Sequence, residues 1–473
     1  MSHDLHAPPL SGPSERIAAQ SNGIPAREWH PSWHARYLLL GVTTVYFLAM
    51  VDRGIFAILS QAIKRDLQLN DFQLGILSGI AFALLYGGLT IPIARLAERF
   101  NRVTLIASVL ALWSTASALS GAATTFALMA LARAGVGAGE AGCHPCAQSL
   151  IADRYPPNRR ATATSIYSLA IPLGTMAGLT GGAYLAQNID WRWAFVAVGV
   201  PGVIVALVMR LTVAEPKRGQ YDPGSTRALP SYSAVLRHLS TRRTFIHLMI
   251  GWILTAAAWS SMGQFMAPYL LRSAFGLDLE QIGWILGLLA GPAALIGTLA
   301  GGFLSDRLAK KDVRFYMWVP SVALLITSIA FVLGLIQTRL ILFIIFFAIG
   351  NICMLVYTGP SWGTLHNLVP AQMRASAVAT LSVIVAVVGA GFGPMVTGEV
   401  SDIAARYISR DDFVKHCVHP ALSNSVACRS ASYGGLKYAL ILTVLLFAWA
   451  SIHYYIAARS IRKDLVSWPG ARP

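Results

Sequence analysis

Residues 340–357 read LILFIIFFAIGNICMLVY, a stretch without one charged side chain. A helix rises about 1.5 Å per residue, so about 20 apolar residues cross the hydrocarbon layer of a bilayer, which is about 30 Å thick. The whole chain has this character: 55% of its 473 residues are hydrophobic and 12% are charged, whereas soluble globular proteins carry about 25% charged residues. The composition therefore excludes a soluble domain and a disordered chain, and five cysteines exclude a disulfide scaffold.

Long apolar stretches of this kind recur along the sequence. They are too long for barrel strands, which would alternate in segments of about 10 residues. We therefore predict an all-α polytopic membrane protein with twelve transmembrane helices. The predicted spans are 37–63, 72–97, 103–124, 126–152, 161–187, 193–213, 244–271, 281–304, 315–336, 340–366, 375–404 and 434–458.

The positive charges of the chain predict its orientation. Most of the 37 Lys and Arg lie in alternate loops on one side of the predicted spans, the side that also holds both termini. This bias is typical of cytoplasmic loops, so we place both termini in the cytoplasm. The net charge of +16 then reflects topology, and we expect no nucleic acid partner. The first 35 residues carry no apolar core and are predicted to be a disordered tail, not a signal peptide.

Two pairs of loops repeat between the halves of the chain. Parallel repeats are one of the known plans of secondary transporters. We predict two pseudo-symmetric six-helix bundles, at 36–213 and 244–460, joined by a cytoplasmic linker at 214–243 and followed by a tail at 461–473. The paired stretches are ARLAERFNR (94–102) with GFLSDRLAK (302–310), and PPNRRATA (156–163) with PAQMRASA (370–377).

Small residues repeat every four positions in spans 2, 5, 8 and 11. Such ridges let two helix backbones approach closely, and their presence in equivalent helices favours a seam between the halves over ordinary packing within each half. The ridges are Gly75, Gly79, Ala83 and Gly87; Gly174, Gly178 and Gly182; Gly283, Gly287 and Gly291; and Gly389, Gly393 and Thr397.

These features together resemble the major facilitator superfamily. The loop after span 2 looks like its signature, with Ala94 in place of Gly, Glu98 in place of Asp and Asn101 in place of Gly. The first half also resembles the bacterial form of the Spinster lipid transporters. This resemblance implies transport of amphipathic lipids such as lysophospholipids or sphingosine phosphates. It rests on VDR (51–53), LARAGVGAGEA (131–141), IPLG (171–174) and DWRWAF (190–195).

Four charged residues fall near the middle of spans 1 and 4, where charges are rare and are functional candidates by default. Asp52 and Arg53 lie in span 1, and Arg133 and Glu140 share one face of span 4. Burial favours the protonated form of a carboxyl group, and a nearby Arg favours the charged form. We therefore predict that Asp52 and Glu140 carry protons and that Arg53 and Arg133 bind an anionic headgroup or re-pair with the carboxylates. The alternative is a static ion-pair network.

Further residues are candidates for substrate contact, for gating and for a disulfide bond. Aromatic and polar side chains in the spans could line a cavity, although each could simply pack. Acid–base pairs at the inner helix ends could hold an inner gate shut, although the Arg and Lys could instead serve topology alone. The substrate candidates are Tyr46, Tyr86, Gln264, Tyr357, Ser361 and Trp362; the gating candidates are Glu98, Arg99, Arg102, Asp306, Arg307 and Lys310; the disulfide candidates are Cys417 and Cys428.

We interpret the chain as a secondary transporter of the inner membrane that works by alternating access. It is expected to couple an amphipathic lipid or organic anion to protons, as a monomer without cofactor or metal. A drug/proton antiporter and a proton-independent facilitator on the same fold remain alternatives. A lipid enzyme acting through Ser361 in GPSWG (359–363) is a third, disfavoured because the motif lies in a predicted span with no strand before it.

Overall fold

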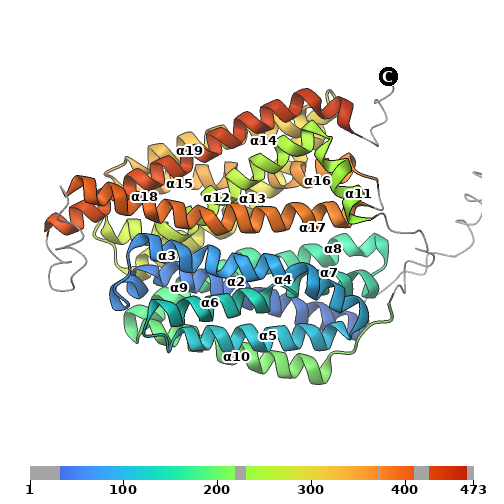
Figure 1. Cartoon of the computed structure of the whole chain (residues 1–473), viewed down its shortest axis with the longest axis horizontal. Coiled ribbons are helices and arrows are strands. Elements are labelled where there is room, and N and C mark those ends of the chain that lie inside the picture. The colour runs from blue at the N-terminus through green and yellow to red at the C-terminus, as the bar shows by residue number, and fades with distance from the viewer. Residues whose placement is uncertain (1–31, 219–230, 371–372, 410–425, 466–473) are drawn as a thin grey trace, which may run out of the picture.

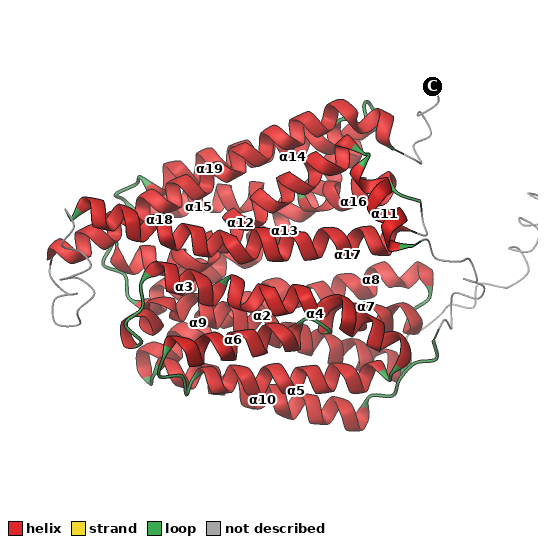
Figure 2. Cartoon of the chain, viewed as in Figure 1, coloured by secondary structure: helices red, strands yellow, loops and turns green. Residues whose placement is uncertain are grey.

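The computed structural model describes residues 32–218, 231–370, 373–409 and 426–465. All regular structure within these ranges is helical, as Figure 2 shows. Eleven helical stretches among the described residues are long and apolar enough to cross a membrane. The predicted fourth span is also present, as two consecutive helices, α6 (Phe126–Glu140) and α7 (Cys143–Arg154). The predicted all-α polytopic membrane fold is confirmed.

The helices form two layers that follow the two halves of the chain (Figure 1). The linker contains one further helix, α11 (Tyr232–Ser240). Besides α6 and α7, the N-terminal half holds α2 (Trp33–Asp66), α3 (Asp71–Ser78), α4 (Ile80–Arg99), α5 (Arg102–Ser120), α8 (Pro157–Ser168), α9 (Ala170–Asn188) and α10 (Trp191–Thr212). The C-terminal half holds α12 (Arg243–Arg272), α13 (Leu279–Ala309), α14 (Phe315–Leu335), α15 (Leu340–Leu355), α16 (Thr358–Leu368), α17 (Arg374–Ile384), the π-helix η2 (Val385–Gly391), α18 (Phe392–Ile408) and α19 (Val426–Asp464).

The ends of the two halves differ slightly from the expected boundaries. α2 begins three residues before the expected position 36, because the Ser32 hydroxyl accepts a hydrogen bond from the Ala35 N–H at 3.3 Å and caps the helix. α19 continues past 460 to Asp464. Figure 1 shows α11 and the end of α19 on the same side of the molecule. We call this side, the predicted cytoplasmic one, the inner side, and the opposite side the outer side.

The predicted seam between the halves is confirmed at the level of helices: α9 contacts α13, α3 contacts α18 and α4 contacts η2. The ridge of span 2 lies in this seam, since a Cβ at Gly75 would lie 2.2 Å from the Pro394 carbonyl oxygen. The ridge of span 8 lies there too, with a Cβ at Gly283 only 2.6 Å from the Ala183 Cβ, but the ridges of spans 5 and 11 do not. Cβ atoms at Gly178 and Gly393 would lie 2.4 Å and 2.5 Å from carbonyl oxygens of α2 and α12, their own halves.

The seam assignment of the span 5 and span 11 ridges is therefore wrong, although α9 and η2 themselves contact the other half. Periodicity indicates that a helix has a close-packed face, but it does not say which neighbour fills it. In span 11 the directions differ within the π-helix η2, where Gly389 faces α12 while Gly391, two residues later, faces Ala83 of α4.

Candidate functional site

The four charged residues of spans 1 and 4 meet as two ion pairs. The Arg53 guanidinium donates to Glu140 Oε2 through Nε at 3.0 Å and through Nη2 at 2.6 Å. Arg133 Nη1 donates to Asp52 Oδ2 at 2.9 Å, and the Ser117 hydroxyl donates to Asp52 Oδ1. Neighbouring positions of α2 thus hold one acid and one base, each paired with the opposite charge on α6, and the cluster has no net charge.

The two pairs differ in their exposure. The Arg53 side chain is 40% exposed while that of Glu140 is 2% exposed, and both partners of the Asp52–Arg133 pair are buried. The Phe82 ring lies between the two guanidinium groups, 5.0 Å from that of Arg53 and 5.6 Å from that of Arg133. Cation–π contacts of this kind hold an Arg in place without using its hydrogen-bond donors. Arg53 is therefore the charge of this cluster that a ligand can reach.

The two carboxylates also differ in how completely they are bonded. Both oxygens of Asp52 accept hydrogen bonds, whereas Glu140 Oε1 is buried without a hydrogen-bond partner among the described residues. Buried polar atoms are nearly always bonded in proteins, so an unpaired one calls for an explanation. A carboxyl oxygen in this state can take a proton or a water molecule.

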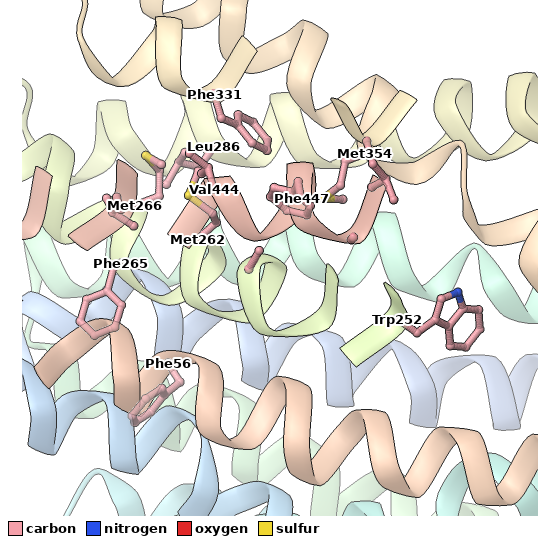
Figure 3. Close-up of a cluster of buried hydrophobic side chains, with 14 of the residues drawn as sticks. Phe56, Trp252, Met262, Phe265, Met266, Leu286, Phe331, Met354, Val444 and Phe447 are labelled. Carbon is pink, nitrogen blue, oxygen red and sulfur yellow. The ribbon is translucent and has the colours of Figure 1, made fainter. Parts of the chain in front are cut away.

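A cavity of about 500 Å³ lies between the two halves beside this cluster. The N-terminal half contributes its polar wall, where Arg53 and Arg133 lie with Tyr46 and Tyr86. The C-terminal half contributes a wall that is largely apolar. Figure 3 shows part of the buried cluster behind this wall, with Met262, Met266, Leu286 and Phe331 close together and Phe56 on the facing helix. The cavity thus has one charged wall and one apolar wall.

Three of the predicted substrate residues line this cavity and three do not. Tyr46, Tyr86 and Gln264 belong to its lining. The other three, all in span 10, turn into the C-terminal bundle. The Ser361 hydroxyl hydrogen-bonds that of Tyr454 at 2.8 Å, and the rings of Tyr357 and Trp362 lie 5.9 Å and 4.4 Å from that of Trp252.

The prediction that these three residues line the cavity is therefore not met: Ser361 is bonded to Tyr454, and the other two rings pack on Trp252 in the same half. Span 10 is interrupted between α15 and α16. The α15 part reaches the cavity through Phe347 and Asn351, and the α16 part does not. The bonding of Ser361 to Tyr454 also removes the basis for a hydrolytic role.

The predicted inner gate is not assembled from the residues expected to form it. Arg102 is buried inside the N-terminal half, where it donates to Asp153 Oδ2 at 2.5 Å, to the Ser149 hydroxyl at 2.7 Å and to Glu215 Oε1 at 2.7 Å. It therefore ties the start of the linker to its own half.

The remaining gating candidates are mostly exposed on the inner side. Asp306 accepts a hydrogen bond from the Tyr316 hydroxyl at 2.9 Å, again within one half. Arg99, Arg307 and Lys310 are exposed. Glu98 lies in α4, but its side chain is outside the described part of the structure. A gating role for this group stays a prediction for another conformation of the protein.

A second charge cluster, which the sequence analysis did not single out, joins the halves on the outer side. We call it the outer lock. Its centre is Asp71 at the start of α3, which is paired with Arg272 of α12 through two hydrogen bonds of 2.8 Å and with Lys64 of α2 at 2.5 Å. Arg272 also donates to Gln61 Oε1 at 3.0 Å and 2.8 Å. The outer lock consists of Gln61, Lys64, Asp71, Arg272, Ser401 and Asp402.

The outer lock also uses the free backbone groups at a helix end. Asp402 of α18 accepts hydrogen bonds from the backbone N–H groups of Asp71 at 3.2 Å and Phe72 at 2.8 Å. These are first-turn donors with no partner inside their own helix. A carboxylate from the C-terminal half thus caps a helix of the N-terminal half. The only signal in the sequence was a set of charges at span ends, where charges are common.

Of the two disulfide candidates, Cys428 is disulfide-bonded. Cys417 lies outside the described residues, so the pairing of the two stays a prediction. The buried Cys143 and Cys146 are free.

Comparison with known proteins identifies the family. Residues 42–394, well over half of the chain, match the model of the Major Facilitator Superfamily. The chain therefore belongs to this superfamily and is a multi-pass membrane transporter, not an enzyme.

Within the superfamily, the resemblance to Spinster is confirmed. A bacterial homologue of the human lysosomal transporter Spinster, in an inward-facing and unoccupied conformation, superposes with a TM-score of 0.84, at 30% identity and with coverage of 93% of this chain and 100% of that chain. An MFS-type efflux pump of Mycolicibacterium smegmatis is 30% identical over 92% of this chain and 94% of its own. A probable L-galactonate transporter of Escherichia coli is 26% identical over 76% and 82%.

Proposed function

We propose that this protein is a proton-coupled secondary transporter of the inner membrane, working by alternating access, that moves an amphipathic lipid of the lysolipid or sphingosine-phosphate type or a related organic anion. The observation that carries the proposal is the cavity between the halves, with a reachable guanidinium on one wall and an apolar opposite wall. The similarity to Spinster homologues agrees with the resemblance from which the lipid class is expected.

The substrate class follows from the two walls. Arg53 keeps its charge at any physiological pH and presents a fork of donors that suits phosphate or carboxylate. The facing wall offers Leu286, Phe331 and Phe347, which gain free energy when they cover an apolar chain. A small polar anion would leave the apolar wall in contact with water, whereas a single-chain anionic lipid places its head at Arg53 and its chain against the apolar wall.

Proton coupling is supported by the position of Glu140, which holds the same guanidinium that an incoming anion would need. Glu140 uses one oxygen on Arg53. If a proton neutralises Glu140, Arg53 is released for the substrate; if the substrate takes Arg53, Glu140 loses its counter-ion and binds a proton more readily. Linkage makes this reciprocal, so anion and proton favour each other at this site. Such coupling moves the two in the same direction.

Asp52 is the second proposed proton carrier. Its charge is held mainly by Arg133, so it accepts a proton more readily when this guanidinium leaves it. This requires that α2 moves relative to α6. We therefore assign Glu140 to the substrate-linked proton and Asp52 to a proton linked to the change of conformation.

The outer lock supports alternating access. It joins α2 and α3 to α12 and α18 on the outer side, so the described conformation is closed to the outside. Transport then requires that the outer lock opens while an inner closure forms.

The test is uptake of lysophosphatidate into proteoliposomes under an imposed pH gradient. We expect the wild type to respond to the gradient, and Glu140→Gln and Asp52→Asn to lose that response. Glu399→Gln is a matched control, because the Glu399 side chain is 43% exposed and forms a loose pair with Arg406 at 3.6 Å. Glu399 takes no part in the charge cluster.

Three results would contradict parts of the proposal. Wild-type pH dependence in both variants would remove the proton assignment. Uptake that ignores a collapsed gradient would identify a facilitator. Export of neutral or cationic compounds that persists in Arg53→Met would favour a multispecific antiporter, in line with the relative described as an efflux pump.

A further inference from the structure

Gln264 stands out among the polar residues of the cavity because its side-chain nitrogen has no hydrogen-bond partner among the described residues. The residue lies on α12, lines the cavity and is 4% exposed. A buried amide donor without an acceptor is rare and unfavourable. Such a donor at the wall of a cavity can take its partner from a bound ligand.

The other polar side chains on the same wall are already bonded to their own helices. The Ser260 hydroxyl donates to the Ala257 carbonyl at 3.3 Å, and the Asn351 amide donates to the Phe347 carbonyl at 2.8 Å. Gln264 differs from both, because its amide nitrogen is buried and has no hydrogen-bond partner among the described residues. Around it the wall is built from Met262, Met266 and similar apolar groups.

The position of Gln264 relative to Arg53 can be read along α2. The carbonyl of Gln264 accepts a hydrogen bond of 3.4 Å from the Ser60 hydroxyl of α2. Ser60 lies seven positions beyond Arg53, which is two helical turns, or about 10 Å toward the outer side. The backbone of Gln264 is therefore on the opposite half from Arg53 and lies about 10 Å further toward the outer side.

We propose that Gln264 is a specificity-determining residue that donates a hydrogen bond to a neutral oxygen of the substrate, placed several bonds beyond its anionic head. An ester carbonyl or a hydroxyl group at the junction of head and chain fits this requirement, and a plain alkyl anion does not. The inference rests on the proposed function and narrows its substrate class. A substrate that reaches both Arg53 and Gln264 also bridges the two halves.

The physical reason for selectivity is that a bound ligand without this oxygen leaves the Gln264 amide without a hydrogen-bond partner and excludes water from it. A site built around a hydrogen-bonding group discriminates against the analogue that lacks its partner, more strongly than an apolar wall discriminates between chain lengths. One neutral hydrogen bond corresponds to about a tenfold preference.

The experiment compares two single-chain phosphomonoesters in proteoliposomes: 1-palmitoyl-lysophosphatidate, which has the oxygens, and hexadecyl phosphate, which does not. For the wild type we expect a kcat/KM about tenfold higher for lysophosphatidate. In Gln264→Met, which keeps the volume and removes the amide, this ratio should fall to about one through loss on lysophosphatidate alone. Ser261→Ala is the control, because the Ser261 hydroxyl is buried on α12 and donates to Ala257 within its own helix.

The outcomes separate the two proposals. A wild type that carries neither probe contradicts the proposed function. A wild type that carries both, with the same ratio in Gln264→Met, overturns the role of Gln264 alone. If Gln264→Met carries neither probe, Gln264→Asn replaces it: the shortened amide should lower the ratio, and a wild-type ratio there also overturns the inference.

Discussion

The outer lock gives a prediction whose size can be worked out from the structure. Replacing Arg272 by Met removes two hydrogen bonds to Asp71 and two to Gln61, in a site where the side chains of Arg272 and Asp71 are 6% and 3% exposed. Breaking a buried pair typically destabilises by 3–5 kcal/mol because one charge is left unpaired. Here Lys64 still neutralises Asp71 at 2.5 Å, so we expect about 2–3 kcal/mol.

This loss of free energy destabilises the outward-closed conformation relative to the outward-open one. It does not destabilise the individual helices. With a factor of ten for each 1.4 kcal/mol, the outward-open state should become about 30- to 150-fold more populated relative to the closed one. A shift of this size moves a two-state equilibrium without unfolding either half.

The backbone amides of Asp71 and Phe72 provide the assay. Their N–H groups are bonded to Asp402 of the opposite half, so they exchange with solvent when the outer side opens. Hydrogen–deuterium exchange of the peptide that starts α3 should accelerate by the same factor in Arg272→Met. Arg462→Met, which removes a charge pair with Asp312 on the inner side, should leave this exchange unchanged.

Unchanged exchange in Arg272→Met would refute the reasoning, since it would mean that the outer lock does not hold the halves together. Faster exchange throughout both halves would refute it too, because it would indicate general unfolding in place of opening.

Three further predictions rest on single contacts. Arg53→Lys keeps the charge but loses the paired N–H donors of the guanidinium, so kcat/KM for an anionic lipid in proteoliposomes should fall about tenfold or more. A wild-type value would contradict the proposed role. Arg102→Met removes a buried guanidinium from two half-buried carboxylates and should lower the stability of the N-terminal half by about 1–3 kcal/mol in thermal or denaturant unfolding, whereas Arg99→Met, on the surface, should have little effect. Gly75→Ala places a Cβ 2.2 Å from a backbone oxygen of the other half and should speed amide exchange in α3, while Gly88→Ala, with open space around it, should not.

Much of the charge cluster could be predicted because its members are unusual in their setting. Asp52 and Glu140 are acids in the middle of apolar helices, and this alone marks them as candidates. Their exact partners could not be predicted. Neighbouring residues on α2 point in different directions, and only the packing of α2 against α6 assigns Glu140 to Arg53 and Arg133 to Asp52.

The outer lock could not be found in the same way. Lys64, Asp71 and Arg272 lie at helix ends, where charged residues also occur for reasons of solvation and topology. Asp71 and Arg272 are far apart in the chain, and nothing local relates them. Likewise, Ser361 and Gln264 are both polar residues in apolar helices, yet one is bonded to Tyr454 inside a bundle and the other opens into the cavity.

The sequence by itself determined the class of protein: long apolar runs must become helices in a membrane, because a bilayer offers no other partner for the backbone. It also determined the two-fold repeat and the place of the costly charges along each span. Tertiary structure decided which face of each helix meets which neighbour, and so which charges pair, which polar groups stay open to a ligand and where the halves are joined. The physical reason is that these contacts depend on rotations of whole helices, which long-range packing sets and local sequence does not.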